Sequence, residues 1–341
     1  MRTGYRYLAP LMVLGLGMAT LETVAAIKAP PGFASAYNTA LVQAKRENKP
    51  VILHFTTDRS VACRKIEQEF YTNAKCQDAL DAFVPTSLDC SNNAPYVRNN
   101  KALLETYGGS DYPFFVVLAP DGAVLGTWSG MLPLESFLQR INQTKQEFDR
   151  YDAFLEKAKT ADQKSLDFHL ESVDIYLATR QWSKMDAAVK TAIRLDTDHS
   201  HLGRIKLAQL QAAAAKKDTR AVNGLVGEIR QLDPDNAGRH LEAALKEQAS
   251  FLVRQISSAP HTLESQYKKA LAILTERAAL PNLKDSLEAK VAIGILQANV
   301  NKFKEARATL ETILSEKLDN EQAEKIKRIL DVIKEMESQK K

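Results

Sequence analysis

Blocks of apolar and polar positions alternate along the first part of the chain. The apolar run from Val51 to Phe55 leads into a polar turn, after which Ile66 and Phe70 stand at helical spacing. A short apolar run bounded by turn residues is typical of a buried strand, and apolar residues at every third or fourth position are typical of an amphipathic helix. The pattern therefore predicts a strand that runs through a turn directly into a helix.

The same analysis extends to about residue 142. It predicts helices over residues 34–48, 73–80, 97–107 and 133–141, and further strands over residues 82–88, 114–118 and 124–128. Asp121-Gly122 is a hairpin turn signal between the last two strands. Strands and helices that alternate and finish in a hairpin predict an α/β sandwich with a mixed sheet.

From about Thr144 onward the composition changes to Ala, Leu, Lys, Glu and Gln with almost no strand formers, which predicts an all-helical half. The segment from Asn301 to Leu314, with Gly294 upstream, resembles the tetratricopeptide pattern of Gly, aromatic, Ala and apolar positions. Weaker copies precede this segment at uneven intervals, at Trp182 to Leu195, Thr219 to Pro234 and Tyr267 to Leu274. A generic helical bundle that uses the same apolar spacing is the alternative.

The tetratricopeptide-like interpretation carries its own expectations. Helix pairs that cannot bury their faces alone would stack into a curved array over about residues 150–335, with a concave surface for a protein partner. Trp182, Tyr267 and Phe303 would be buried at helix contacts.

The turn after the first predicted strand carries the candidate chemistry. It reads Thr57-Asp-Arg-Ser-Val-Ala-Cys63 and resembles the exported thioredoxin-like family, in which a polar residue, a Trp and Cys-x-x-Cys follow the strand. Arg59 falls on the Trp, Ser60 on the first cysteine and Cys63 on the second. The resemblance implies a thioredoxin fold whose attacking thiol is absent. A serine hydroxyl forms no mixed disulfide, so a two-cysteine reductase cycle is not expected.

A second stretch supports this resemblance. The family has a tyrosine, a glycine, a loop, a proline, a strand and a hairpin in this order. The same order occurs here in Tyr107-Gly-Gly-Ser-Asp-Tyr-Pro113, the strand that follows it and Asp121-Gly122. The resemblance covers about residues 34–142. It implies that Pro113 is cis and that the backbone at Tyr112 and Pro113 faces a substrate, which it would pair with as a strand does.

His54 falls where active members of the family place a buried Asp beneath the second cysteine. One interpretation makes His54 a base that deprotonates Cys63, since imidazole can accept a thiol proton. The other makes it a structural His bonded to the backbone or to a neighbouring hydroxyl, with Cys63 an inert small hydrophobe. For Ser60 we expect helix N-capping, with Asp58 as its competitor.

The N-terminus has the pattern of a secretory signal. A basic start is followed by an apolar run over residues 8–21 and by the small residues Thr23 to Ala26. A retained membrane anchor is the alternative, but Pro10 and Glu22 leave the run short of the roughly 20 residues that a spanning helix needs. We expect a periplasmic or otherwise exported protein.

The expected domains are a signal peptide at residues 1–25, a thioredoxin-like domain at 26–143 and a tetratricopeptide-like helical repeat domain at 144–341.

The three cysteines could form a disulfide in an oxidising compartment. Cys63 and Cys90 should share the carboxyl end of the sheet, and Cys76 should lie elsewhere. Three separate thiols are favoured over any single disulfide, because a bridge needs Cα atoms within about 7 Å.

Composition narrows the function classes. The net charge of +4 is small and spread along the chain, so no nucleic-acid partner is expected. Residues 196–201 contain Asp and His but lack metal-ligand spacing, so we interpret them as a solvated turn and expect neither metal nor cofactor.

Two functions remain open. The favoured one is a protein-binding or scaffold module that is not a classical disulfide reductase and offers a helical-repeat surface to a protein or peptide partner. After signal cleavage it would have no membrane association. The alternative is a single-thiol redox protein that exchanges disulfides through Cys63, with His54 as its base.

Overall fold

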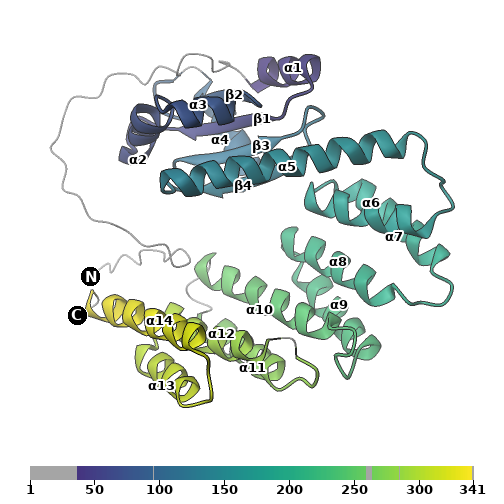
Figure 1. Ribbon diagram of the computed structural model, residues 1–341, viewed down its shortest axis with the longest axis vertical. Coiled ribbons are helices and arrows are strands. Elements are labelled where there is room, and N and C mark those ends of the chain that lie inside the picture. Colours follow the sequence, from purple (N-terminus) through teal and green to yellow (C-terminus); the bar gives the residue numbers. More distant parts are fainter. Residues whose placement is uncertain (1–36, 95, 259–262, 284, 340–341) are drawn as a thin grey trace. The chain divides into compact units, whose positions relative to one another are not determined.

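The structure is a computed structural model that describes residues 37–94, 96–258, 263–283 and 285–339 (Figure 1). The predicted signal peptide and the segment up to residue 36 lie outside the described residues. The chain divides after Thr191 into two compact units, and each is described by itself. No described helix is both long enough and apolar enough to cross a membrane.

A four-stranded mixed sheet forms the core of the first unit. The strands are β1 (Val51–Thr56), β2 (Val84–Asp89), β3 (Phe114–Leu118) and β4 (Val124–Ser129), in the order β2-β1-β3-β4. β1 pairs parallel with β2 and antiparallel with β3, and β3 pairs antiparallel with β4. Every residue of β1 is buried, as expected for a central strand covered on both faces. The predicted mixed sheet is confirmed.

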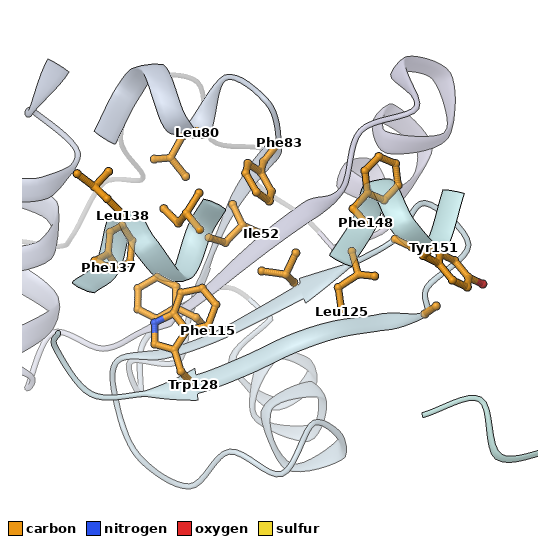
Figure 2. Close-up of a cluster of buried hydrophobic side chains, with 14 of the residues drawn as sticks. Ile52, Leu80, Phe83, Phe115, Leu125, Trp128, Phe137, Leu138, Phe148 and Tyr151 are labelled. Atoms are coloured by element: carbon orange, nitrogen blue, oxygen red, sulfur yellow. The ribbon is translucent and has the colours of Figure 1, made fainter. Parts of the chain in front are cut away.

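Helices cover both faces of this sheet. One face carries α1 (Tyr37–Glu47) and α4 (Val97–Thr106). The other carries α2 (Val61–Lys65), the π-helical turn η1 (Ile66–Phe70), α3 (Ala74–Leu80) and α5 (Leu134–Ala158). Figure 2 shows the second interface, where Ile52 and Phe115 of the sheet meet Phe137 of α5. Successive residues of a strand point to opposite faces, so the all-apolar run of β1 fills both layers.

The predicted closing helix over residues 133–141 is wrong in its extent. α5 continues to Ala158, and Phe148, Tyr151 and Phe154 are buried along the continuation. Their helical spacing places all three on one apolar face of α5, and this face stays buried along the continuation. The predicted domain boundary between residues 143 and 144 thus falls within a continuous helix.

The continuation of α5 joins a helix pair to the sheet. This pair is α6 (Leu166–Ala178) and α7 (Trp182–Leu195). The Tyr151 hydroxyl donates to Asp121 Oδ2 at 2.7 Å and accepts from Gln181 Nε2 at 2.8 Å. The backbone N–H of Val124 donates to the carbonyl of Thr179 at 3.3 Å. The hairpin of β3 and β4 is therefore tied to the turn between α6 and α7.

The second unit is helical. Its helices are α8 (Leu202–Ala215), α9 (Thr219–Leu232), α10 (His240–Ser258), α11 (Leu263–Ala278), α12 (Ser286–Asn299), α13 (Phe303–Leu314) and α14 (Asn320–Ser338). Neighbours along the chain pack in the pairs α8–α9, α10–α11 and α12–α13, and α14 packs on α13. Tyr267 and Phe303 are buried, as predicted. The prediction that Trp182 is buried is wrong, because this residue, at the start of α7, is half-exposed.

The short connections within helix pairs repeat one backbone feature. Arg180, Lys217 and Asn301 each have a positive φ, of 55°, 61° and 66°, and each lies two residues before the second helix of its pair. The left-handed conformation reverses the chain direction in few residues.

Asp196, in the loop interpreted as a turn, is buried and accepts a hydrogen bond from the His201 backbone N–H. This aspartate has a structural role.

Candidate functional site

Ser60 caps the N-terminus of α2. Its backbone is extended, with φ of −92° and ψ of 115°, and its side-chain oxygen accepts a hydrogen bond from the Cys63 N–H at 3.2 Å. Such a cap pairs one of the N–H groups that the first helical turn leaves free. The predicted N-cap is confirmed. The competitor, Asp58, instead donates its backbone N–H to Ser91 Oγ at 2.9 Å.

The Tyr112–Pro113 loop lies beside this cap. The peptide bond between the two residues is cis, as the family resemblance implied. The Ser60 hydroxyl donates to the Tyr112 carbonyl oxygen at 3.4 Å. Both the acceptor and the donor function of Ser60 are therefore used inside the protein. Pro113 is buried and Tyr112 is half-buried, at the point where β3 begins.

The Cys63 thiol is closed off from solvent. Cys63 is the third residue of α2, has 0% exposure and is not in a disulfide. A thiolate that attacks a disulfide has to reach its sulfur atom along an open path. In this conformation Cys63 cannot meet a disulfide on another molecule.

His54 points into an aromatic cluster. Its Nδ1 lies 2.9 Å from the Tyr71 hydroxyl oxygen, and its ring stacks on Phe115 with the centroids 4.6 Å apart. Its Nε2 has no hydrogen-bond partner among the described residues, so no hydrogen bond joins His54 to Cys63. Full burial lowers the pKa of His54 to about 3, because desolvation disfavours the imidazolium. Its role as a base for Cys63 stays a prediction, against which this low pKa argues.

Glu67 is a site residue that the sequence analysis missed. It lies in η1, one helical turn beyond Cys63, and accepts a hydrogen bond from Thr56 Oγ1 at 3.2 Å. Burial, helped by the nearby Asp89 carboxylate, raises the pKa of Glu67 to about 7 against the opposing effect of the Thr56 hydrogen bond. Glu67 can therefore hold or release a proton near neutral pH. A signal was available, because the family pattern that this turn resembles continues after its second cysteine as Lys-x-[Leu/Met]-Glu, and Glu67 falls on that Glu.

The other two cysteines lie where the sequence analysis expected them. The backbone N–H of Cys90 donates to the Thr56 carbonyl at 2.8 Å, which places Cys90 at the carboxyl end of β1 and β2. Cys76 lies on α3 in the core of the opposite face. Burial raises the pKa of Cys76 to about 11 and also raises the pKa of Cys90.

The structure thus brings four predicted site residues to one end of the sheet: Ser60, Cys63, Tyr112 and Pro113. His54 is bonded to Tyr71 instead of joining them. Within the described part of the chain, no cluster of three or more His, Cys, Asp or Glu side chains is arranged to hold a metal ion.

The helical unit has a groove of its own. It lies between α12 and α14 and has a volume of about 180 Å³. Its wall is mostly aliphatic, with Val291, Ile295 and Ile329, and its rim carries Glu288 and Lys325. An engineered apolar cavity of about 150 Å³ can hold benzene, so this groove has room for one large apolar side chain.

Comparison with known protein families supports the fold of the region that contains the sheet. Residues 37–145 match the family model of the thioredoxin-like domain, and no curated protein matches the chain. The first region is therefore a thioredoxin-like α/β region, and a predominantly helical part follows it.

Three solved structures resemble the same region. The reduced C-terminal domain of DsbD from Neisseria meningitidis is 25% identical over 31% of this chain and 92% of that chain, with a TM-score of 0.28. A thioredoxin from Thermus thermophilus is 26% identical over 32% of this chain and 83% of that chain, with a TM-score of 0.28. The DsbH oxidoreductase is 16% identical over 36% of this chain and 94% of that chain, with a TM-score of 0.29.

Proposed function

We propose that the protein is an exported protein-binding module whose thioredoxin-like region does not turn over disulfides. Export is inferred from the N-terminal sequence pattern. The binding role is inferred from the loop at Tyr112 and Pro113 and from the groove of the tetratricopeptide-like helical part.

One observation carries this proposal: the position of the family's attacking thiol holds a serine whose hydroxyl is bonded to Cys63 N–H and to the Tyr112 carbonyl. A hydroxyl has a far higher pKa than a thiol and forms no disulfide. Capping therefore stabilises the fold of the site without giving it a nucleophile. Ser60 therefore supports the structure of the site but cannot carry out thiol–disulfide exchange.

Burial weighs against the alternative of a single-thiol redox protein. Cys63 is fully buried, and the base expected to serve it, His54, is a weak one because of its low pKa. The half-buried Glu67, one helical turn beyond Cys63, has a pKa that suits proton transfer at neutral pH. Thiol exchange through Cys63 would therefore need an opening of the site.

The helical part offers a second place for a partner. Half-exposed aliphatic side chains such as Ile295 and Ile329 line the groove between α12 and α14. Apolar surface of this kind, rimmed by charged residues, is typical of a site that takes an apolar anchor from another chain. Repeats of paired helices commonly bind partners in this way.

A binding measurement tests the proposal. Fluorescence anisotropy would follow a labelled, unfolded polypeptide whose thiols have been blocked by carboxymethylation. We expect the wild type to bind it. Tyr112→Ala should weaken binding by roughly tenfold, or about 1.4 kcal/mol, if the loop is the site. Ile329→Asp should do so if the groove is the site.

Val42→Ala is the matched control, because Val42 is 69% exposed on α1 and belongs to neither the loop nor the groove. Absence of binding by the wild type would contradict the proposal. So would equal binding by the wild type, Tyr112→Ala and Ile329→Asp.

A further inference from the structure

The end of β2 is tied to the turn that carries Ser60 and Cys63. The backbone N–H of Cys90, the first residue after β2, donates to the Thr56 carbonyl at 2.8 Å. One residue further, Ser91 Oγ accepts from the Asp58 N–H at 2.9 Å. Cys90 is therefore held against the segment that leads into Cys63.

Tyr112 contacts residues next to both cysteines. Its carbonyl oxygen accepts the Ser60 hydroxyl, which in turn caps Cys63. Its ring packs on the core cluster that contains Cys90, and its hydroxyl interacts with the Cys90 thiol. Burial is the main reason why the pKa values of Tyr112 and Cys90 are raised, and the Cys63 thiol adds a smaller effect to both.

We propose that Cys63 and Cys90 form a dithiol–disulfide couple beside the Tyr112–Pro113 loop. Cys90 supplies the second sulfur that Ser60 cannot. The couple goes beyond the proposed function, which needs no thiol chemistry. Since both thiols are buried, the couple changes state slowly and stoichiometrically, as a switch next to the binding loop, and does not turn over as a catalyst.

The oxidant is a disulfide of a small thiol or of another protein. Once the site opens, the Cys63 thiolate attacks one of its sulfurs, which forms a mixed disulfide and expels one thiolate. The Cys90 thiolate then attacks Cys63 Sγ, which forms the Cys63–Cys90 bond and expels the second thiolate. The two protons lost by the protein thiols protonate the two leaving groups. The protein gives up two electrons, and the external disulfide is reduced to two thiols.

Cys63 is the better choice for the first attack. Burial raises the pKa of Cys90, which lowers its thiolate fraction, and the Cys90 thiol also contacts the Leu88 carbonyl at 3.7 Å. Attack by Cys90 in the second step is intramolecular, and proximity then compensates for the effect of its raised pKa.

The test uses the full-length protein and glutathione disulfide. After incubation the protein is acid-quenched, unfolded and alkylated, and its mass and peptide map are measured. We expect only Cys76 to be alkylated out of the three cysteines, with a linked pair of peptides that contains Cys63 and Cys90. Cys90→Ala should keep the small thiol attached to Cys63, which is the trapped intermediate.

Cys76→Ser is the matched control and should form the same bond as the wild type. Alkylation of all three wild-type cysteines would overturn the proposal, and so would a bond that includes Cys76 or a mixed disulfide that never resolves in the wild type. The peptide map of the wild type decides between these outcomes even if a variant fails to fold.

Discussion

The Ser60 side-chain oxygen lies 3.2 Å from the Cys63 backbone nitrogen and accepts its hydrogen bond. The sequence resemblance implies that these are the positions of the family's two cysteines. The relationship between the two residues is structural here, because the first caps the helix that holds the second. Several measurable properties depend on it and on the buried groups around it.

Removal of the cap should destabilise the protein without unfolding it. For Ser60→Ala we expect a loss of about 1 kcal/mol in the free energy of unfolding, since Cys63 N–H loses its acceptor. Urea denaturation followed by circular dichroism measures this. Arg59→Ala, at the exposed neighbouring position, is the control and should change stability by less than about 0.5 kcal/mol. Equal effects of the two substitutions would show that capping is not what Ser60 provides.

Tyr71 should matter through its hydroxyl group. Tyr71→Phe keeps the ring but removes the hydrogen-bond partner of Nδ1 in the buried His54, whose Nε2 already has none among the described residues. Leaving a buried polar group unpaired costs about 1–3 kcal/mol, and we expect a stability loss in that range. Tyr96→Phe is the matched control, because Tyr96 is 74% exposed. A neutral Tyr71→Phe would mean that the His54–Tyr71 bond adds nothing to stability.

His54 and Glu67 should give stability opposite dependences on pH. The pKa of His54 falls from 6.5 to about 3 on folding, so the unfolded chain binds more protons in that interval and stability is lost as pH falls. The pKa of Glu67 rises from 4.5 to about 7, so the folded chain binds more protons and stability is lost as pH rises. Between pH 4.5 and 6.5 the two effects oppose each other.

Single substitutions separate the two groups. Glu67→Gln should make stability fall more steeply than in the wild type as the pH is lowered from 6.5 to 4.5, since only the His54 effect remains. His54→Leu should change the slope in the opposite direction. Urea unfolding at several pH values measures both slopes. Parallel curves for the three proteins would show that neither group changes its pKa on folding.

Gly294 should be required for close packing of α12 on α13. A Cβ atom built there would lie 2.8 Å from Leu310 Cγ, so Gly294→Ala forces the helices apart. We expect a loss of about 1–3 kcal/mol despite the better helix propensity of Ala. Gly224→Ala in α9 is the control: a Cβ there meets nothing within 4 Å, and we expect a gain of up to about 1 kcal/mol. Stabilisation by both substitutions would contradict this packing.

Much of the thioredoxin-like region could be predicted from the sequence. The apolar run of β1, the Asp121-Gly122 hairpin and the Ser60 cap are local signals, and the structure contains all three. The cis bond at Pro113 came from family resemblance, because an isolated proline does not indicate it.

Other features depend on contacts that sequence patterns do not encode. The π-helical turn η1 breaks the regular helical spacing, so no periodicity argument places the Tyr71 hydroxyl against His54. The raised pKa of Glu67 arises from burial, which follows from tertiary packing. The extension of α5 was missed because the family resemblance ends near residue 142, and the apolar spacing beyond it was assigned to the repeats.

The most direct measurement is the rate of insulin reduction by dithiothreitol in the presence of the wild type and of Ser60→Cys. The wild type should leave the rate at its uncatalysed value, because Ser60 is not a thiol and the buried Cys63 reacts too slowly to turn over. Ser60→Cys should raise the rate, since it restores a thiol at the helix start beside Tyr112 and Pro113. Catalysis by the wild type well above the uncatalysed rate would contradict the account.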